Sequence, residues 1–472
     1  MTETATPDNS AALFVEGSKC PIARVDQIED AAKLLRSKSA VAHSPDLFAG
    51  RKDDEVNGEI NVREFLAASM MFVEGESHRR RRKLLNPLVR ADALQGIRED
   101  VVLPEADRLM HIRMGEPDAD GRYRMDLIEF LERVFIHFTA RLIGLIDIDS
   151  DERMELMRSF AGPLAAGTSS AYLSDRNAVN ASALRAKAKY VESFFAPSLA
   201  WHRVQRARIT AGEIAEDDVP GSLLKMVAAK LAPEWEDEDN AVVESTLLFA
   251  ASVGTSTQSI VHTIDFLQSW FVDHPEDLPR KTESRFLLNS LQEVIRLRAP
   301  FSPYTTRLVM EEGELADGTK IVPGQELRME YVKANRDVEV FGPDAADFNP
   351  KRPDPTNKMA RYGLGFGVGT HQCYGLRVVV GNDGTGGAHL ELLRRLMAAG
   401  VRPDPDNPAV GLEKDMSKFD VEDIPRYIEY SAVFDDWDPV TTSSATTLTE
   451  SAQEPQATSL GSVSDLDEVR IS

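Results

Sequence analysis

The stretch Phe366–Gly375, FGVGTHQCYG, constrains this chain more than any other part of its sequence. Glycine allows tight turns and close backbone approach, so Gly369 and Gly375 predict a turn that delivers Cys373 to the start of a helix. Amides at a helix start stabilise a negative sulfur, and the thiolate is the form of cysteine that binds metals. With Phe366 packed beside the sulfur, the loop predicts a thiolate ligand for a flat metal cofactor. A cysteine that is merely buried in a loop is the alternative.

Composition narrows the class of protein. Of 472 residues, 42% are hydrophobic and 28% are charged, as in soluble globular proteins. The formal net charge of −23 argues against non-specific nucleic-acid binding. The two cysteines, Cys20 and Cys373, give no disulfide framework and are typical of a reducing cytosol. The N-terminus lacks the basic start and apolar run of a signal peptide, and no stretch has the roughly 20 apolar residues of a spanning helix. We therefore expect a cytoplasmic protein that binds neither membrane nor nucleic acid.

Both ends of the chain are predicted to be tails, at residues 1–20 and 439–472. The C-terminal tail is rich in Ser, Thr, Glu and Gln and has no aromatic residue. It cannot bury enough apolar surface to offset the entropy cost of ordering, so we expect disorder there rather than a docking role. Residues 21–438 are predicted to form one large domain.

Hydrophobic periodicity within that domain is mostly helical. Between 126 and 145, Leu127, Leu131, Val134, Phe135 and Phe138 fall on one helical face. Asp239 or Asn240 is the expected cap of a long helix. After residue 298 the hydrophobic pattern is that of strands, which lie on either side of an Ala-Asp-Gly turn at 316–318. The predicted fold class is mostly α with a small β portion, with helices at 126–145, 176–207, 222–231, 239–272, 284–298 and 388–397 and strands at 306–310 and 326–330.

Two charged motifs accompany the cysteine loop. Glu293 and Arg296 are three residues apart and share one helix face, and Arg352 lies shortly before the loop. A carboxylate held by two guanidiniums is a rigid bidentate network, for which we predict a structural role, whereas an exposed pair would contribute little. His78 and Arg82, in the basic stretch HRRRRK, are one helical turn apart and can reach the same anion. A nucleic-acid signal is the alternative for this stretch, but the acidic chain has no other basic run.

The long predicted helix contains a run of small residues, AASVGTST, at 250–257. Such residues let a ligand approach a helix closely, although ordinary helix packing also uses them. The hydroxyl of Thr255 can bond back to a carbonyl one turn earlier and loosen the helix for a water molecule.

Taken together, these motifs resemble those of the cytochromes P450, in the family's order and over roughly residues 20–436. The cysteine loop matches the haem-binding pattern Phe-x-x-Gly-x-x-x-Cys-x-Gly, and the charged residues match the family's Glu–Arg–Arg cluster and His-x-x-x-Arg helix. The resemblance implies a P450-like fold and heme b with Cys373 as axial ligand of the iron. The roles it implies for other residues are loop packing for Phe366, propionate binding for His78, Arg82, Arg307 and His371, oxygen activation and proton handling for Thr255, and a structural network of Glu293, Arg296 and Arg352.

The resemblance is to the soluble bacterial branch and implies a haem-thiolate monooxygenase. Such an enzyme inserts one atom of O2 into a small, largely apolar organic substrate. Because the chain has no room for a flavin domain, the electrons would come from a separate ferredoxin and ferredoxin reductase. Substrate contacts are expected by analogy of position at Leu247, Leu248, Ala251, Pro303 and Tyr304.

The sequence departs from the family pattern at two places. Gly254 stands where the family has an acid that helps to pass protons, so a substrate carboxylate, a water chain through Ser252 or Ser256, or a hydroxyl relay would have to replace it. Alternatively, the protein is a peroxide-driven peroxygenase, a haem-thiolate reductase, or a haem protein that binds ligands without turnover. After the cysteine, valines at 378–380 and four glycines within 381–387 predict a kink or break in the following helix.

Overall fold

The computed structural model describes residues 23–43, 55–56, 59–60, 68–168, 175–298, 304–355, 359–381, 387–411 and 426–437. Contacts divide the chain into Met1–Asp436 and Trp437–Ser472. The tails predicted at 1–20 and 439–472 lie outside the described residues, and a single domain over 21–438 stays a prediction. In the described ranges, we find no helix that combines the length and the apolar character needed to cross a membrane.

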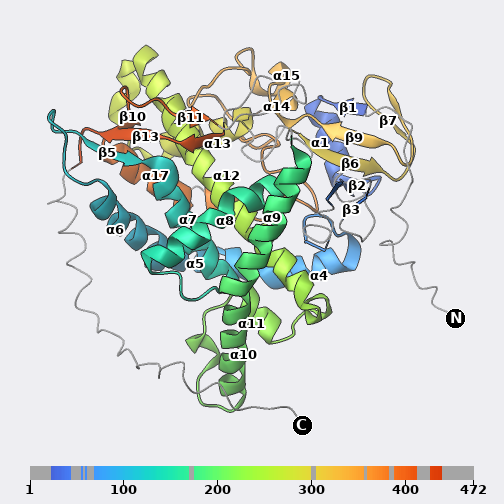
Figure 1. Ribbon diagram of the computed structural model, residues 1–472. Helices are drawn as coiled ribbons and strands as arrows, with labels where there is room; N and C mark the ends of the chain where they lie inside the picture. The colour runs from blue at the N-terminus through green and yellow to red at the C-terminus, as the bar shows by residue number, and fades with distance from the viewer. Residues whose placement is uncertain are drawn as a thin grey trace, which may run out of the picture. The chain divides into compact units, whose positions relative to one another are not determined.

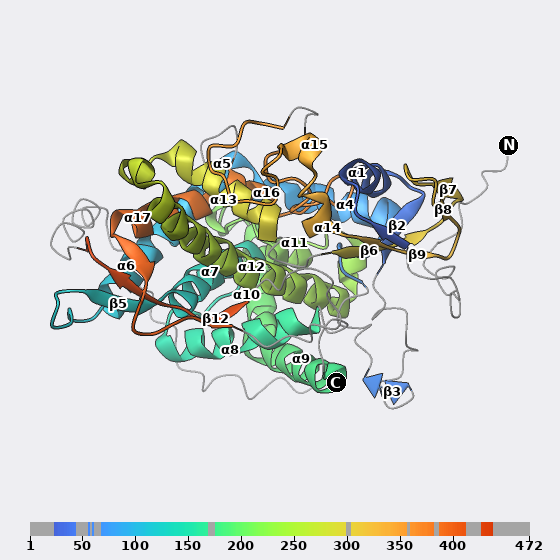
Figure 2. The same cartoon turned by 90° about the horizontal axis from the view of Figure 1, so that it is seen from above.

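The centre of the first unit is helix α12 (Glu238–Asp273), which has 36 residues and is roughly 54 Å long. Its N-cap is Asp237, whose carboxylate accepts a hydrogen bond from the Asp239 N–H at 3.1 Å. The cap is thus Asp237 rather than the predicted Asp239 or Asn240, because the acidic run offers several capping side chains. Figures 1 and 2 show α12 crossing the interior, in contact with helices α7 (Leu127–Ile143), α8 (Asp151–Gly167) and α13 (Ser284–Arg298).

Helix α7 forms where the periodicity predicted a helix at 126–145. The Asp126 carboxylate caps it by accepting hydrogen bonds from Ile128 and Glu129, and Gly144 ends it with a φ of 92° that favours glycine. The face predicted to be apolar is buried: Leu127, Leu131, Val134, Phe135 and Phe138 are all at most 2% exposed. Burial of this face against α12 anchors the helix.

The remaining helices surround this centre. The segment predicted as one helix at 176–207 is divided by a π-helical turn at Val191–Phe195. Helix α16 ends at Val380 and α17 begins at Ala388, which confirms the predicted break after the cysteine. The other helices are α1 (Ile28–Arg36), α4 (Gly75–Leu85), α5 (Ala91–Ile97), α6 (Leu103–Arg113), α9 (Arg176–Tyr190), α10 (Ala196–Thr210), α11 (Leu223–Ala228), α14 (Tyr331–Ala334), α15 (Val338–Phe341), α16 (Leu376–Val380) and α17 (Ala388–Ala398).

Short strands form the β portion. The two predicted strands pair antiparallel as β6 (Thr305–Val309) and β9 (Glu326–Met329), with Arg307 opposite Leu327. They join β1 (Ala23–Val25) and β2 (Ala40–His43) in a sheet of order β1-β9-β6-β2. A second sheet has the order β10-β13-β5. The remaining strands are β3 (Glu55–Val56), β4 (Glu59–Ile60), β5 (Tyr123–Asp126), β7 (Gly313–Glu314), β8 (Lys320–Ile321), β10 (Val401–Pro403), β11 (Val410–Gly411), β12 (Tyr427–Glu429) and β13 (Ser431–Phe434).

The predicted fold class, mostly α with a small β portion, is confirmed. The turn at 316–318 connects β7 and β8, a small hairpin inserted between β6 and β9. For the site, the important consequence is that β6, α4 and the segment before α16 bring distant parts of the chain together around Cys373.

Candidate functional site

The loop before Cys373 is a closed turn held by its own backbone. The Cys373 N–H donates to the Phe366 carbonyl at 2.8 Å, and the Gln372 N–H donates to the Gly369 carbonyl at 3.2 Å. Gly369 has a φ of 80°, and a Cβ atom there would lie 2.5 Å from the carbonyl oxygen of Leu35 in α1. Only glycine therefore fits where the loop passes α1.

The sulfur of Cys373 lies directly before α16. Burial raises the pKa of the Cys373 thiol, while the Gly375 and Leu376 backbone and the charge of Arg82 act to lower it. The residue as a whole is nonetheless exposed. Since a thiol that coordinates a metal loses its proton to the metal's charge, a raised pKa in the free protein is compatible with a ligand role.

Phe366 anchors the loop to the helices beneath it. Its ring packs edge-on against Tyr362 at 5.0 Å between centroids. Both rings contact a small apolar cluster of Leu291 and Ile295 in α13 and Val379 in α16. The aromatic side chain thus ties the cysteine loop to α13 and α16.

Helix α4 presents basic side chains to the same loop. His78 is buried, and its ring lies 4.4 Å from that of His371 in the cysteine loop. One turn further, the guanidinium of Arg82 lies 5.2 Å from the ring centroid of Tyr374, whose hydroxyl donates to the Leu85 carbonyl. Burial lowers the pKa of Arg82, and the nearby Cys373 opposes that effect. The structure therefore brings His78, Arg82 and His371 together beside Cys373.

Glu74, which the sequence analysis did not single out, shows that this region can hold a carboxylate. Its Oε1 lies 3.0 Å from His371 Nε2 and accepts a hydrogen bond from the Ala42 N–H at 3.1 Å. Burial would raise the pKa of Glu74, but His371, Ala42 and Arg307 outweigh it and lower the pKa. Arg307 reaches this place because β6 pairs Arg307 with Ala42 in β2. In the sequence, the only indication that Glu74 could lie at the site was its position four residues before His78.

The buried ring of His78 adds a second sign of an anion site. Its Nδ1 has no hydrogen-bond partner among the described residues, although a buried polar nitrogen normally has one. Burial and the neighbouring His371 and Arg82 lower the pKa of His78 to about 4, against which Glu74 acts. An incoming carboxylate would satisfy this nitrogen and stabilise a proton on it. The residues predicted to bind propionates thus fit a group that carries carboxylates.

Helix α12 supplies the residues predicted to face oxygen and substrate. The Thr255 hydroxyl donates to the Ala251 carbonyl at 2.6 Å, the expected back-bond, and its own carbonyl accepts from the Ser259 hydroxyl. Ser252 is engaged by the Thr139 hydroxyl of α7 at 2.8 Å. Ser256 is buried. A water chain through Ser252 would have to replace its hydrogen bond with Thr139, and one through Ser256 would have to reach a buried side chain.

The predicted substrate contacts differ in accessibility. Leu248 and Ala251 are half-buried, whereas Leu247 is buried. Tyr304 is also buried, with the guanidinium of Arg328 over its ring at 3.4 Å. Pro303 lies outside the described residues. Leu248 and Ala251 therefore remain the best placed of these residues to contact a ligand on α12.

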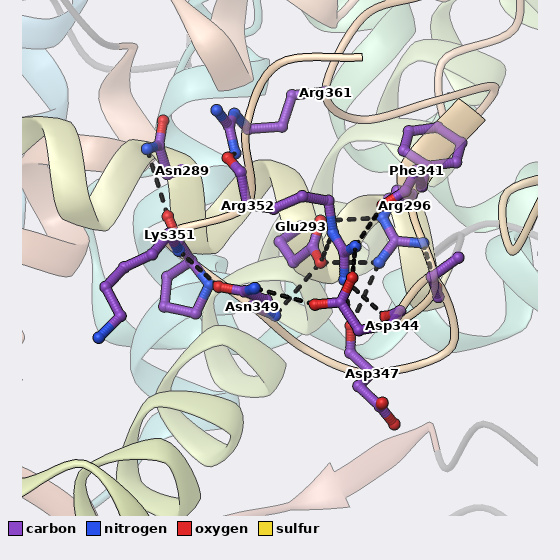
Figure 3. Close-up of polar contacts among 12 residues, drawn as sticks. Asn289, Glu293, Arg296, Phe341, Asp344, Asp347, Asn349, Lys351, Arg352 and Arg361 are labelled. Carbon is purple, nitrogen blue, oxygen red and sulfur yellow. Dashed lines mark hydrogen bonds and ion pairs between the residues drawn. The ribbon is translucent and has the colours of Figure 1, made fainter. Parts of the chain in front are cut away.

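The charged cluster predicted around Glu293 is assembled and fully buried (Figure 3). Arg296 donates to both carboxylate oxygens of Glu293, at 2.8 and 2.7 Å. Arg352 donates to Oε1 at 2.8 Å, and the Asn349 N–H donates to the same oxygen at 3.2 Å. One carboxylate is therefore shared by two guanidiniums and a backbone amide.

This cluster extends to the backbone that leads into the cysteine loop. Arg296 donates to the carbonyls of Asn335 and Ala345, both at 2.6 Å. The Asn335 side chain returns a hydrogen bond to the Arg296 carbonyl and accepts one from the Leu364 N–H at 2.7 Å. Arg361 donates to the Arg352 carbonyl. Asn335 and Arg361 were missed in the sequence because they lie in segments without periodicity.

Comparison with known proteins shows similarity to one family. The family model described as Cytochrome P450 matches residues 282–378, which include Glu293, Arg352 and Cys373. Cytochrome P450 72A15 of Arabidopsis thaliana is 28% identical over 34% of this chain and 34% of its own length. The chain thus spans about a third of that relative. Vitamin D3 dihydroxylase of Streptomyces griseolus is 25% identical over 79% of this chain and 88% of its own length.

Solved structures agree in fold. CalO2 has a TM-score of 0.62 at 16% identity, covering 87% of this chain and 90% of its own. Substrate-free CYP109E1 from Bacillus megaterium also has a TM-score of 0.62 at 16% identity, covering 90% and 96%. At such identity the likeness shows the fold alone. The chain is thus similar to the cytochromes P450 in sequence over residues 282–378, which carry the cysteine loop, and in fold over most of its length.

Proposed function

We propose that this protein is a haem-thiolate monooxygenase of the soluble bacterial type. It would insert one atom of O2 into a small, largely apolar organic substrate and release the other as water, using two electrons and two protons. The observation that carries the proposal is an exposed Cys373 beside a cluster of basic residues, one of which, His371, already contacts the carboxylate of Glu74. The match of residues 282–378 to the Cytochrome P450 family model supports it.

The residues fit heme b in particular. Cys373 would be the axial ligand of the iron, with Phe366 supporting its loop. His78, Arg82, Arg307 and His371 would bind the two propionates, since buried carboxylates need partners of opposite charge. When bound, an iron porphyrin with a thiolate ligand supplies the oxygen chemistry, because the thiolate donates electron density that favours O–O cleavage.

The chain itself would position the substrate and handle protons. Leu248 and Ala251 form an accessible apolar stripe on α12, with Leu247, Pro303 and Tyr304 as further expected contacts. The Thr255 hydroxyl, held by the Ala251 carbonyl, would hold a proton next to that stripe. Glu293, Arg296 and Arg352 would keep the cysteine loop in place. A ferredoxin and its reductase in the cytoplasm would supply the electrons.

A second candidate function follows from Gly254, which leaves α12 without an acid beside Thr255. A peroxide-driven peroxygenase needs no delivery of electrons and protons to O2, and a haem-thiolate reductase uses electrons without O2 insertion. A haem protein that binds ligands without turnover is the third possibility, against which Thr255 argues.

One comparison of electron sources tests the proposal. The haem-loaded protein is incubated with a panel of small apolar acids, phenols, terpenes and steroids, once with ferredoxin, reductase and O2 and once with peroxide alone. We expect oxygenated product, carrying one atom of labelled O2, in the first arm. Product only with peroxide would favour the peroxygenase. Reduction of an added ligand without oxygen insertion would favour the reductase, and no product in either arm would favour a ligand-binding protein.

The propionate assignment predicts weaker haem binding when Arg82 is replaced. Arg82→Gln removes one half-buried cation that would form a charge-assisted hydrogen bond, so haem affinity should fall about 10- to 100-fold. Transfer of haem to apomyoglobin measures the change. The control is Arg79→Gln on the same helix, because Arg79 is exposed and pairs with Glu76. Equal haem loss in both variants would contradict the assignment.

A further inference from the structure

The half-buried side chain of Arg426 lies beside α12 at Gly254, where the helix lacks an acid. A Cβ atom at Gly254 would lie 2.9 Å from Nη2 of Arg426 and 3.8 Å from its Cζ. The glycine therefore gives the guanidinium room to lie against the helix backbone. Position 254 and Arg426 are distant in sequence, so this contact was not visible in the sequence motifs.

The backbone that carries Arg426 is fixed to α12. Tyr427, the first residue of β12, exchanges two hydrogen bonds with the side chain of Gln258. Its carbonyl accepts from Nε2 at 2.8 Å and its N–H donates to Oε1 at 2.9 Å. Gln258 is one helical turn beyond Gly254. This double contact holds the neighbouring Arg426 beside position 254.

The charge of Arg426 is only weakly compensated in the part of the chain that is described. Burial lowers the pKa of Arg426, and Glu132 of α7 opposes this effect. That carboxylate is already engaged, because it accepts a hydrogen bond from Arg158 at 3.1 Å. Among the described residues, no carboxylate lies within the 4.0 Å ion-pair distance of Arg426. An arginine remains charged in proteins, and a half-buried charge without a close partner can still gain from an anion that pairs with it.

The guanidinium also lies next to the accessible stripe of α12. Gly254 directly precedes Thr255, whose hydroxyl is bonded to the Ala251 carbonyl. Phe249, Ala250 and Val253 are buried. The residues on this part of the helix that stay half-buried are Leu248, Ala251, Ser252, Gly254 and Thr255. A ligand against this stripe would have Arg426 at its edge.

We propose that Arg426 binds a carboxylate of the substrate, so that the substrates of this enzyme are organic acids with an apolar body. This rests on the monooxygenase function proposed above. A carboxylate and a guanidinium form a bidentate pair, which would orient the apolar body along Leu248 and Ala251. The bound carboxylate would also put an acidic group beside Thr255, where Gly254 provides none.

The test compares acids with matched neutral molecules on the haem-loaded, full-length protein. Straight-chain and aryl-substituted carboxylic acids are titrated alongside their own primary amides, and binding is measured by calorimetry. We expect the best acid to bind about 10- to 100-fold more tightly than its amide. Acids that bind no better than their amides, including the case in which none binds, would contradict the proposal.

Two variants locate the effect. Arg426→Gln should remove the preference for the acid and leave amide binding unchanged. Gly254→Asp should do the same, because its carboxylate would pair with Arg426 and exclude that of the ligand; the guanidinium, as the end of a flexible side chain, can move to admit it. Arg402→Gln is the control, since Arg402 forms a surface pair with Asp435 and its loss changes the net charge equally. A preference that persists in Arg426→Gln, or that Arg402→Gln also abolishes, would overturn the assignment.

Calorimetry keeps this inference separate from the proposed function. Binding needs neither electrons nor O2. If the protein prefers acids through Arg426 but forms no oxygenated product with either electron source, the monooxygenase proposal fails and the anion site stands. If product forms from neutral substrates and acids are not preferred, the anion site at Arg426 fails and the monooxygenase proposal stands.

Discussion

Replacement of Cys373 by alanine is expected to abolish the thiolate-type absorbance of the reduced carbonyl–iron complex. Cys373 is exposed and lies just before α16, and it is the only cysteine of the loop. Without it, bound haem would have to take a ligand other than a thiolate. Because an essential group is lost, the rate of substrate oxidation should fall by about 10³-fold or more. Difference spectra and turnover assays measure the two effects.

The matched control for this prediction is Cys20→Ala. Cys20 is the other cysteine of the sequence, so this variant removes a thiol without touching the proposed ligand. It should keep both the absorbance and the oxidation rate. A thiolate spectrum that survives in Cys373→Ala, or disappears in Cys20→Ala, would show that the ligand has been assigned wrongly.

The parts of the fold that the sequence predicts are those with local signals. Helix α7 follows from an apolar period that repeats over its length, and the strands β6 and β9 were predicted at 306–310 and 326–330. The β1 strand has three residues and pairs with β9 about 300 positions later, so no local pattern indicates it. Helix α1 was not among the predicted helices, although six of its nine residues are buried.

The candidate site likewise has parts with local sequence signals and parts that only the folded chain brings together. The cysteine loop and the spacing of Glu293 and Arg296 are local, and the structure places them as the sequence indicated. The carboxylate of Glu74 interacts with the cysteine loop through His371 and with two strands through Ala42 of β2 and Arg307 of β6, which meet only in the folded chain. At position 254 the sequence shows only a missing acid. The neighbouring cation comes from a strand fixed to α12 by a contact between residues 169 positions apart.

Removal of the Glu293 side chain is expected to destabilise the protein more than any other single substitution in the cluster. Glu293→Ala would leave the buried guanidiniums of Arg296 and Arg352 without their shared carboxylate, and breaking one buried pair typically costs 3–5 kcal/mol. We therefore expect the free energy of unfolding to fall by about 5 kcal/mol. That loss is a large share of the roughly 5–15 kcal/mol available to a folded domain, so urea denaturation followed by circular dichroism is the measurement.

Glu293→Gln keeps the prediction testable if the alanine variant does not fold. Glutamine retains the size of the side chain but is neutral and offers one acceptor oxygen in place of two, so at least one hydrogen bond from a guanidinium is lost and the loss should be about 3 kcal/mol. Glu76→Gln is the control, because its exposed pair with Arg79 on α4 should contribute nothing measurable. Since Arg296 and Asn335 connect this carboxylate to Leu364, haem should also dissociate faster from Glu293→Gln than from the control. Unchanged stability with unchanged haem retention would mean that the cysteine loop is held by its own turn rather than by this network.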